Sequence, residues 1–175
     1  MPRIPYAEEG TEAEGATQVY ANLKTGFGFV PNLVKLLGHS GPATQAIGAI
    51  LDNYFHHLSL EPRIREMAYL TVARSNHCGY CIGHHTFFAK QAGITDTEIA
   101  LFGESGFTSE QLTQAERAVV RFAFETTKNV VASEEALEGL KKAYTLAQIA
   151  EIAFVVATAN FIQRIGKNLG AELER

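Results

Sequence analysis

Both cysteines of this chain lie in one short stretch, Ser75–Thr86, which reads SNHCGYCIGHHT and also holds three histidines. Cys78 and Cys81 are separated by two residues, so on a helix they share one face at a distance that permits a disulfide. A thiolate near a helix start is stabilised by free backbone N–H groups and by the helix dipole, which act most strongly on Cys78. The pattern leaves three kinds of site open: a redox-active dithiol, a metal site, or two buried neighbouring thiols.

The three histidines are candidate bases for this pair. His85 follows Cys81 by four residues and continues the same helix face. His84 follows it by three residues, so spacing alone keeps both histidines as candidates. His77 precedes the pair and points either toward it or to solvent.

An acid on an apolar helix face is a further candidate. Glu66 has apolar residues three, four and seven positions further on, the first of them Tyr69. A carboxylate on such a face needs a partner, and a histidine or a thiol would serve. The alternative is that Glu66 pairs with Arg63 at the surface, and the sequence does not decide between them. Glu61 and Arg65 are expected to form an ordinary exposed pair.

The elements that must position these side chains are predicted to be helices. Apolar residues recur every three or four positions, and no segment alternates with a period of two. Pro62 is expected to begin one helix that runs to Ala73. Asn76 is expected to cap the next helix, from about His77 to Gln91, which carries the dithiol.

Further helix starts are marked by capping residues. They are the pairs Thr95 with Glu98, Thr113 with Glu116 and Thr145 with Gln148, together with Ser133. The longest predicted helices cover residues 113–129 and 145–169, and the second is apolar on more than one face, as in a central helix or one shared with a neighbouring subunit. We predict an all-α fold of seven to nine helices without a sheet, with an extended arm over residues 1–15 and a single helical domain over residues 16–175.

Composition excludes several function classes. The 175 residues suit one domain, and a net charge of −4 without a Lys/Arg cluster argues against nucleic-acid binding. The first residues do not resemble a targeting signal, and the longest apolar run, residues 149–162, is too short to cross a bilayer. We therefore expect a cytoplasmic protein without a membrane segment. Cysteines in that compartment stay reduced unless they are catalytic, redox-sensing or metal-bound.

Other chemistries of the Cys-x-x-Cys spacing fit less well. A structural zinc site needs four ligands, and only the set Cys78, Cys81, His85 and Glu66 is available for it. Covalent haem attachment needs a histidine directly after the second cysteine, where this chain has Ile82. A thioredoxin-type dithiol follows a strand, and none is predicted here.

Two aromatic clusters carry weaker signals. His56 and His57 follow Phe55 near a predicted helix end, where such histidines are usually solvated. Phe87 and Phe88 are expected in the core, with the alternative that they line an apolar pocket.

The stretch REMAYLTVARSNHCGYCIGHHTFFAKQAG resembles the signature of the alkylhydroperoxidase AhpD-like branch of the carboxymuconolactone decarboxylase superfamily. That signature is an acid, Cys-x-x-Cys twelve residues later, and a histidine four residues after the second cysteine. Glu66, Cys78, Cys81 and His85 match its four positions. The resemblance covers a redox core at about residues 45–95, and the longer N-terminal part resembles the peroxidase-related members.

This resemblance implies a helical homo-oligomer, a trimer or a hexamer, that reduces small organic hydroperoxides without metal or other cofactor. Cys81 would attack the peroxide and Cys78 would resolve the resulting sulfenic acid to a disulfide. Glu66 and His85 would relay protons and lower the pKa of Cys81. An external dithiol or thioredoxin-like protein would restore the thiols.

One position departs from the family pattern. The best-known members have a histidine directly before the second cysteine, where this chain has Tyr80. A phenol donates a hydrogen bond but is a poor base, so Tyr80 would weaken or redirect the peroxidase, with His84 and His77 as further supporting residues. Decarboxylation is not expected, because the decarboxylase members lack the dithiol. The alternative function is a redox sensor or a zinc-binding module that uses the same cluster.

Overall fold

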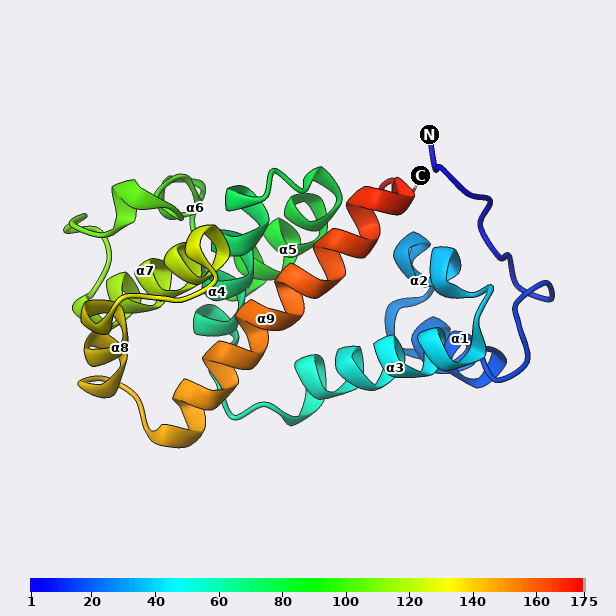
Figure 1. The fold of residues 1–175 in the computed structure, drawn as a ribbon, viewed down its shortest axis with the longest axis horizontal. Coiled ribbons are helices and arrows are strands. Elements are labelled where there is room, and N and C mark those ends of the chain that lie inside the picture. The colour runs from blue at the N-terminus through cyan, green and yellow to red at the C-terminus, as the bar shows by residue number, and fades with distance from the viewer. Residues whose placement is uncertain (175) are drawn as a thin grey trace. The chain divides into compact units, whose positions relative to one another are not determined.

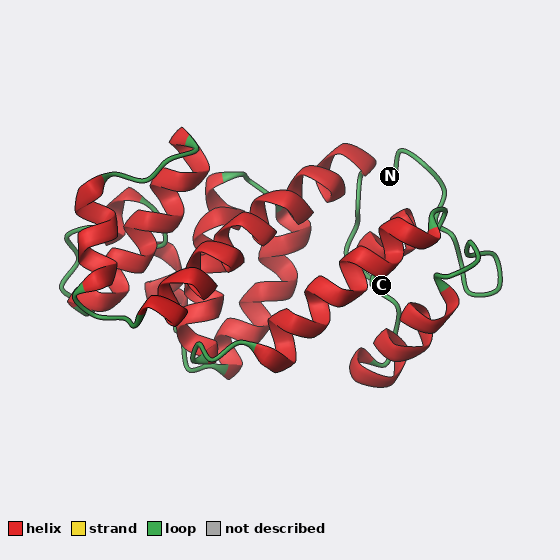
Figure 2. Cartoon of the chain, turned by 60° about the horizontal axis from the view of Figure 1, so that its bottom comes forward, coloured by secondary structure: helices red, strands yellow, loops and turns green. Residues whose placement is uncertain are grey.

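The computed structural model describes residues 1–174, and within them every regular element is a helix (Figures 1 and 2). The α-helices are α1 (Thr17–Phe27), α2 (Asn32–Leu37), α3 (Gly41–Asp52), α4 (Pro62–Ser75), α5 (Gly79–Gln91), α6 (Asp96–Ala100), α7 (Gln114–Asn129), α8 (Glu134–Lys141) and α9 (Leu146–Leu169). A π-helical segment, η1 (Asn53–His57), continues α3, and a short 3-10 helix, η2 (Glu104–Gly106), precedes α7. The predicted all-α fold is confirmed.

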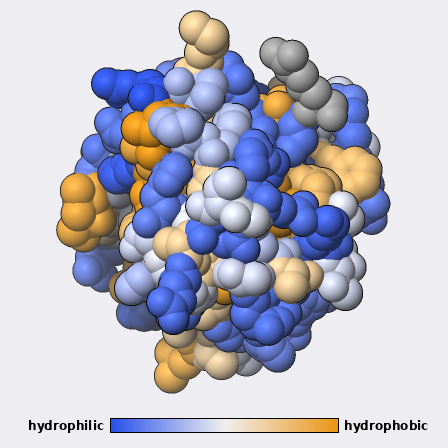
Figure 3. All heavy atoms as spheres, turned by 90° about the vertical axis from the view of Figure 1, so that its right-hand side faces the viewer, coloured by the Kyte–Doolittle hydropathy of each residue, from blue (hydrophilic) through white to orange (hydrophobic). Residues whose placement is uncertain are grey.

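The chain forms two compact units. One contains residues 1–58 and 164–174, and the other contains residues 59–163, which include the dithiol. Figure 3 shows one face of the molecule, on which hydrophilic residues predominate and apolar residues form small scattered groups. Such a distribution is ordinary for a protein surface.

In the first unit, residues 1–16 contain no helix but are held against α1 and α2. The Tyr20 hydroxyl donates to the carbonyl oxygen of Ala7 at 2.8 Å, and Lys35 forms an ion pair with Glu8 at 2.7 Å. The N-terminal segment is therefore an irregular arm that is fixed by specific contacts.

Helix starts in the second unit follow the predicted caps. Thr95 and Thr113 each accept a bond from the backbone N–H three residues on, and the glutamate there accepts from the backbone N–H of the threonine. Thr145 and Gln148 make the corresponding pair at the start of α9, and Ser133 caps α8. All four predicted caps are confirmed.

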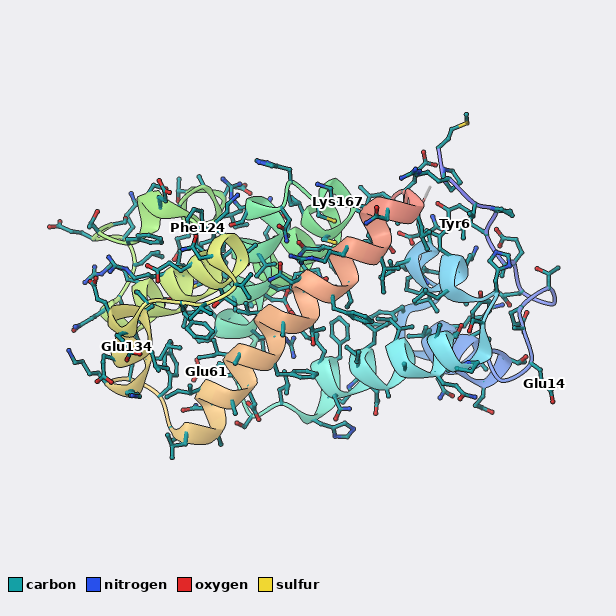
Figure 4. The ribbon with its side chains drawn as sticks, viewed as in Figure 1. Tyr6, Glu14, Glu61, Phe124, Glu134 and Lys167 are labelled. Carbon is teal, nitrogen blue, oxygen red and sulfur yellow. The ribbon has the colours of Figure 1, made fainter. Side chains whose placement is uncertain are left out.

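Helix α4 is the centre of the second unit. It packs against α5 and α7, and eight consecutive residues, Glu66–Ala73, are buried. Figure 4 labels Phe124 of the neighbouring helix α7, and the ring of Phe124 packs edge-on against Phe107 with centroids 5.6 Å apart. A helix buried on all faces must pair any charge that it carries, which applies to Glu66.

The turn between α4 and α5 places the dithiol. Asn76 directly follows α4 as its C-cap residue, and His77 adopts a left-handed conformation with φ of 51°. The N–H groups of His77 and Cys78 bond to the carbonyls of Arg74 and Ala73 at 3.0 and 2.9 Å, the pattern of a Schellman motif. The prediction that Asn76 caps the next helix is thus wrong, because Asn76 ends α4 and the next helix begins at Gly79.

The side chain of Asn76 fastens this turn to α9. Its amide donates to Gln163 Oε1 at 2.8 Å and to Asn160 Oδ1 at 3.1 Å. The α9 helix is also tied to the start of α4, since the Glu151 carboxylate accepts bonds from the backbone N–H groups of Ser59 and Leu60 at 2.9 to 3.0 Å. These polar contacts hold the dithiol turn from the side of α9.

Helix α9 is longer than the apolar run seen in the sequence. Its 24 residues have a mean hydropathy of 1.4 over the most apolar window, which by length and composition is enough to cross a membrane. A core helix of a soluble protein passes the same test, and 39% of that window is buried. Phe154 and Phe161 remain exposed by 36% and 47% on one side of α9.

Arg63 joins α4 to the elements around it. Its guanidinium pairs with Glu98 of α6 and with Glu116 of α7, the latter at 2.7 Å, and it donates to the carbonyl of Gly93 at 3.3 Å. Burial alone would raise the pKa of Glu98, but the Thr95 backbone N–H and Arg63 outweigh it and lower the pKa to about 2. Arg63 therefore compensates two carboxylates that are largely out of water.

We expect Arg63→Gln to lower the free energy of unfolding by about 2 kcal/mol, because it leaves two partly buried carboxylates without their cation. Urea unfolding followed by circular dichroism measures this. Lys90→Gln, which loses only an exposed pair with Asp96, should leave the unfolding midpoint unchanged. Equal midpoints for the two variants would contradict the structural role of Arg63.

Candidate active site

Glu66 and His85 form the buried core of the site. Oε2 of Glu66 lies 2.7 Å from Nδ1 of His85, and the Glu66 side chain is fully buried. An ionised carboxylate only accepts hydrogen bonds, so Nδ1 carries the proton and Nε2 is the basic nitrogen of His85. Sequence spacing left His84 and His85 as equal candidates, and the structure pairs Glu66 with His85.

A cation next to Glu66 compensates its charge. Arg65 Nε donates to Glu66 Oε1 at 3.2 Å, and the Arg65 side chain is only 13% exposed. The alternative pairing of Glu66 with Arg63 is excluded, because Arg63 bonds to other carboxylates. The expected exposed pair of Glu61 with Arg65 is also wrong, since Arg65 turns toward the buried acid.

The two thiols lie at the start of α5. Cys78 is the N-cap residue that precedes the helix, and Cys81 is its third residue, within the first turn. Both are present as thiols, are exposed by only 1% and 3%, and place their sulfur atoms 2.6 Å apart. The sulfurs therefore face each other as disulfide formation requires.

Tyr69 connects the dithiol to the acid–histidine pair. Its ring stacks on the imidazole of His85, with centroids 3.4 Å apart and an interplanar angle of 14°. Its hydroxyl forms a side-chain hydrogen bond with Cys81. Glu66, His85, Tyr69 and Cys81 therefore form one continuous buried group that α4 and α5 contribute together.

The pKa of Cys81 is raised, whereas the family resemblance implied that the proton relay would lower it. The main cause is the hydrogen bond with Cys78, followed by burial and by the charge of Cys78, and the bond from Tyr69 opposes them. Sulfurs at this distance titrate as a pair, so the first proton leaves the pair and the second is held tightly. The reduced site thus carries at most one negative charge.

The reduced protein is expected to lose stability as the pH rises above about 8.5, the ordinary pKa of a thiol. Above that pH the unfolded chain releases a proton that the folded chain keeps on the thiol pair, so the raised pKa of Cys81 disfavours folding. Between about pH 7.5 and pH 9.5 the free energy of unfolding should fall by about 1 kcal/mol more for wild type than for Cys81→Ala. Urea unfolding under a phosphine reductant measures this difference. The same dependence of the unfolding free energy on pH in wild type and Cys81→Ala would refute the prediction.

The remaining predicted site residues lie at the edge of this group. Tyr80 packs its ring against His84, with centroids 4.7 Å apart, and His77 is exposed at the turn. The phenol that forms a hydrogen bond with the second cysteine is that of Tyr69, one helix earlier, which the sequence analysis did not single out.

Of the two aromatic clusters, one prediction is confirmed and one is partly wrong. His56 and His57 are exposed, as expected. Phe88 is half-buried and packs edge-on against His85 with centroids 5.8 Å apart. Phe87 is 60% exposed, so it does not belong to the core.

The structure also bears on the zinc alternative. Within residues 1–174, no group of three or more histidine, cysteine or acidic side chains is arranged to hold a metal ion. The zinc-binding alternative stays a prediction that metal analysis of the protein tests.

Sequence reasoning missed Tyr69 and Arg65 as members of the site. Tyr69 lies three residues after Glu66 on the same face of α4, and that face meets the dithiol helix. An aromatic hydroxyl on the face that carries a buried acid is the signal that could have identified Tyr69. Arg65 gave no such signal, because its neighbour Glu61 offered an equally good partner.

The site combines a buried acid and histidine with two adjacent thiols on an all-helical fold. Residues 43–125 match the carboxymuconolactone decarboxylase family. This match, together with the AhpD-like fold, supports the assignment of the chain to the carboxymuconolactone decarboxylase superfamily. No curated protein matches the chain.

Solved structures share this fold at low sequence identity. A peroxidase-related protein from Ralstonia eutropha JMP134 with an alkylhydroperoxidase AhpD core is 21% identical, with a TM-score of 0.82 over 99% of this chain and 92% of that one. A peroxidase-related protein from Silicibacter sp. TM1040 is 20% identical, with a TM-score of 0.79 over 99% and 94%. The debrominase Bmp8 is 21% identical, with a TM-score of 0.76 over 93% and 87%.

Proposed function

We propose that this protein is a thiol-dependent peroxidase that reduces small organic hydroperoxides through a dithiol–disulfide cycle of Cys78 and Cys81. The observation that carries the proposal is a buried Glu66–His85 hydrogen bond of 2.7 Å that is linked through Tyr69 to two thiols 2.6 Å apart. These side chains come from two packed helices, which supports their joint use as nucleophile, resolving thiol and proton relay.

In the first step, the Cys81 thiolate attacks the outer oxygen of the hydroperoxide. The S–O bond forms as the O–O bond breaks, and the electron pair of that bond leaves on the alkoxide. The alkoxide takes a proton from the relay of His85 and Glu66, which gives an alcohol and a sulfenic acid on Cys81.

In the second step, Cys78 attacks the sulfenic sulfur, and water leaves as the disulfide forms. An external dithiol or thioredoxin-like protein then reduces the disulfide, which transfers two electrons and two protons to the site. We place this cycle in the cytoplasm, where thiol reductants are available, and in a homotrimer or homohexamer, with no metal or other cofactor.

A second candidate function is reductive debromination, which the likeness to the debrominase Bmp8 favours. One structure of that protein holds 2,3,4-tribromopyrrole. A thiolate that attacks a carbon-bound bromine forms an S–Br bond while the carbon takes a proton. The second thiol then displaces bromide to give the same disulfide, so a dithiol at this spacing serves either reaction.

Turnover assays separate these functions from a sensor or a zinc module. Metal-analysed protein is incubated with excess dithiothreitol and either cumene hydroperoxide or 2,3,4-tribromopyrrole, and alcohol or bromide is measured. We expect many turnovers with the hydroperoxide. Repeated bromide release without hydroperoxide turnover would favour the debrominase. A single oxidation per chain would indicate a sensor, and one zinc per chain without oxidation would indicate a zinc module.

A further inference from the structure

Two sulfurs only 2.6 Å apart raise the question of which one carries the negative charge. A second charge at that distance is strongly unfavourable, so the reduced pair carries at most one. The start of α5 favours a thiolate on Cys78, which precedes the first turn. The proposed chemistry, on the other hand, needs the charge on Cys81.

Tyr69 lies where it can influence which of the two sulfurs carries the negative charge. It lies within the buried stretch of α4, is 3% exposed, and is held by stacking on His85, which Glu66 fixes in turn. Its hydroxyl reaches Cys81. The Tyr69 ring therefore cannot move its hydroxyl away from Cys81 without losing its stacking contact with His85.

The phenol acts as a hydrogen-bond donor and not as an acid. Burial, followed by the charges of Cys81, Cys78 and Glu66, raises the pKa of Tyr69 well above its ordinary value. Tyr69 therefore keeps its proton at every pH at which the dithiol works. A bond donated to an anion is about twice as strong as one between neutral groups, so Tyr69 favours the state in which Cys81 is the thiolate.

We propose that Tyr69 is a catalytic residue whose hydroxyl donates a hydrogen bond to Cys81 and so holds the single negative charge of the dithiol on Cys81 instead of Cys78. This inference rests on the proposed function in assigning the attack to Cys81. The charged and titratable groups that bear on this balance are Cys78, Glu66 and His85, with Arg65 acting through Glu66.

The test measures which thiol reacts first, without any peroxide. Fully reduced wild type and Tyr69→Phe are treated at neutral pH with too little iodoacetamide to modify more than one thiol per chain. Fragment-ion mass spectrometry then gives the ratio of alkylated Cys81 to alkylated Cys78. Loss of a hydrogen bond to a charged sulfur should lower this ratio by about tenfold or more.

Matched variants control for packing. Tyr144→Phe removes a partly buried hydroxyl elsewhere in the same unit and should leave the ratio unchanged. If Tyr69→Phe does not fold, 3,5-difluorotyrosine at position 69 keeps the hydroxyl as a stronger donor and should raise the ratio. An unchanged ratio in the Tyr69 variants, or an equal fall in Tyr80→Phe, overturns the inference.

The result is independent of the proposed function. A shifted ratio in a protein that turns over neither hydroperoxide nor bromopyrrole supports the role of Tyr69 at the thiolate and rejects the enzyme. Normal hydroperoxide turnover with an unchanged ratio rejects the role of Tyr69 and leaves the peroxidase proposal intact.

Discussion

Cys81→Ser is expected to abolish hydroperoxide reduction, with a loss of about 10³-fold or more in the second-order rate constant. The physical reason is that a serine hydroxyl is not ionised in this buried site and is not oxidised by peroxide. Packing should change little, because serine differs from cysteine by one atom. A coupled assay that follows alcohol formation under excess dithiothreitol measures the loss.

Cys78→Ser is the matched control for this prediction. It keeps the attacking sulfur and removes the resolving one, so a single equivalent of hydroperoxide should still be consumed and leave a sulfenic acid on Cys81. Dimedone labelling identifies that product. A sulfenic acid on Cys78 in the Cys81→Ser variant would reverse the assigned roles.

Glu66→Gln should lower hydroperoxide turnover by about 10²-fold, because the amide cannot hold a protonated imidazole as the carboxylate does. The same change should lower the free energy of unfolding by about 3 kcal/mol. The loss of stability is expected because the partly buried Arg65, which bonds to Glu66 Oε1 at 3.2 Å, would then face an uncharged amide. Steady-state kinetics and urea unfolding measure the two effects separately.

Glu110→Gln provides the control, since Glu110 is exposed and lies outside the site. It should retain wild-type turnover and stability. Should Glu66→Gln behave like this control, the buried carboxylate would have neither a catalytic nor a structural role, and the relay would have to be abandoned.

Most of the helical frame could be predicted because its signals are local. A threonine three residues before a glutamate or glutamine bonds to nearby backbone whatever the rest of the chain does, and such caps mark the starts of α6, α7 and α9. The spacing of Cys78, Cys81 and His85 is equally local, since one helix carries all three.

The contacts of the site depended on tertiary packing and were harder to predict. Arg65 had two acidic neighbours in sequence, and only the burial of α4 selects Glu66. The Asn76 side chain could cap a helix or reach another element, and its bonds to Asn160 and Gln163 come from α9, far along the chain. Tyr69 looked like a core residue until α5 placed His85 and Cys81 against it.

The pKa of Cys81 likewise depends on tertiary packing and could not be predicted from the sequence. Sequence spacing suggested an activating base, but a 2.6 Å separation of two sulfurs makes the pair titrate together, and the spacing could not give that distance. In a buried thiol pair that shares one proton, the thiolate is stabilised by the other thiol and by a tyrosine donor. This differs from a single cysteine whose thiolate is stabilised by histidine alone. The proposed peroxidase must therefore work as a mono-anionic dithiol.

The most direct measurement is a count of free thiols in the fully reduced protein before and after one equivalent of cumene hydroperoxide. Our account predicts that both thiols of each chain disappear together and that mass spectrometry finds an internal Cys78–Cys81 disulfide. Two thiols that survive the oxidant in folded protein would contradict the account, and the cluster would then have to serve a purpose other than peroxide reduction.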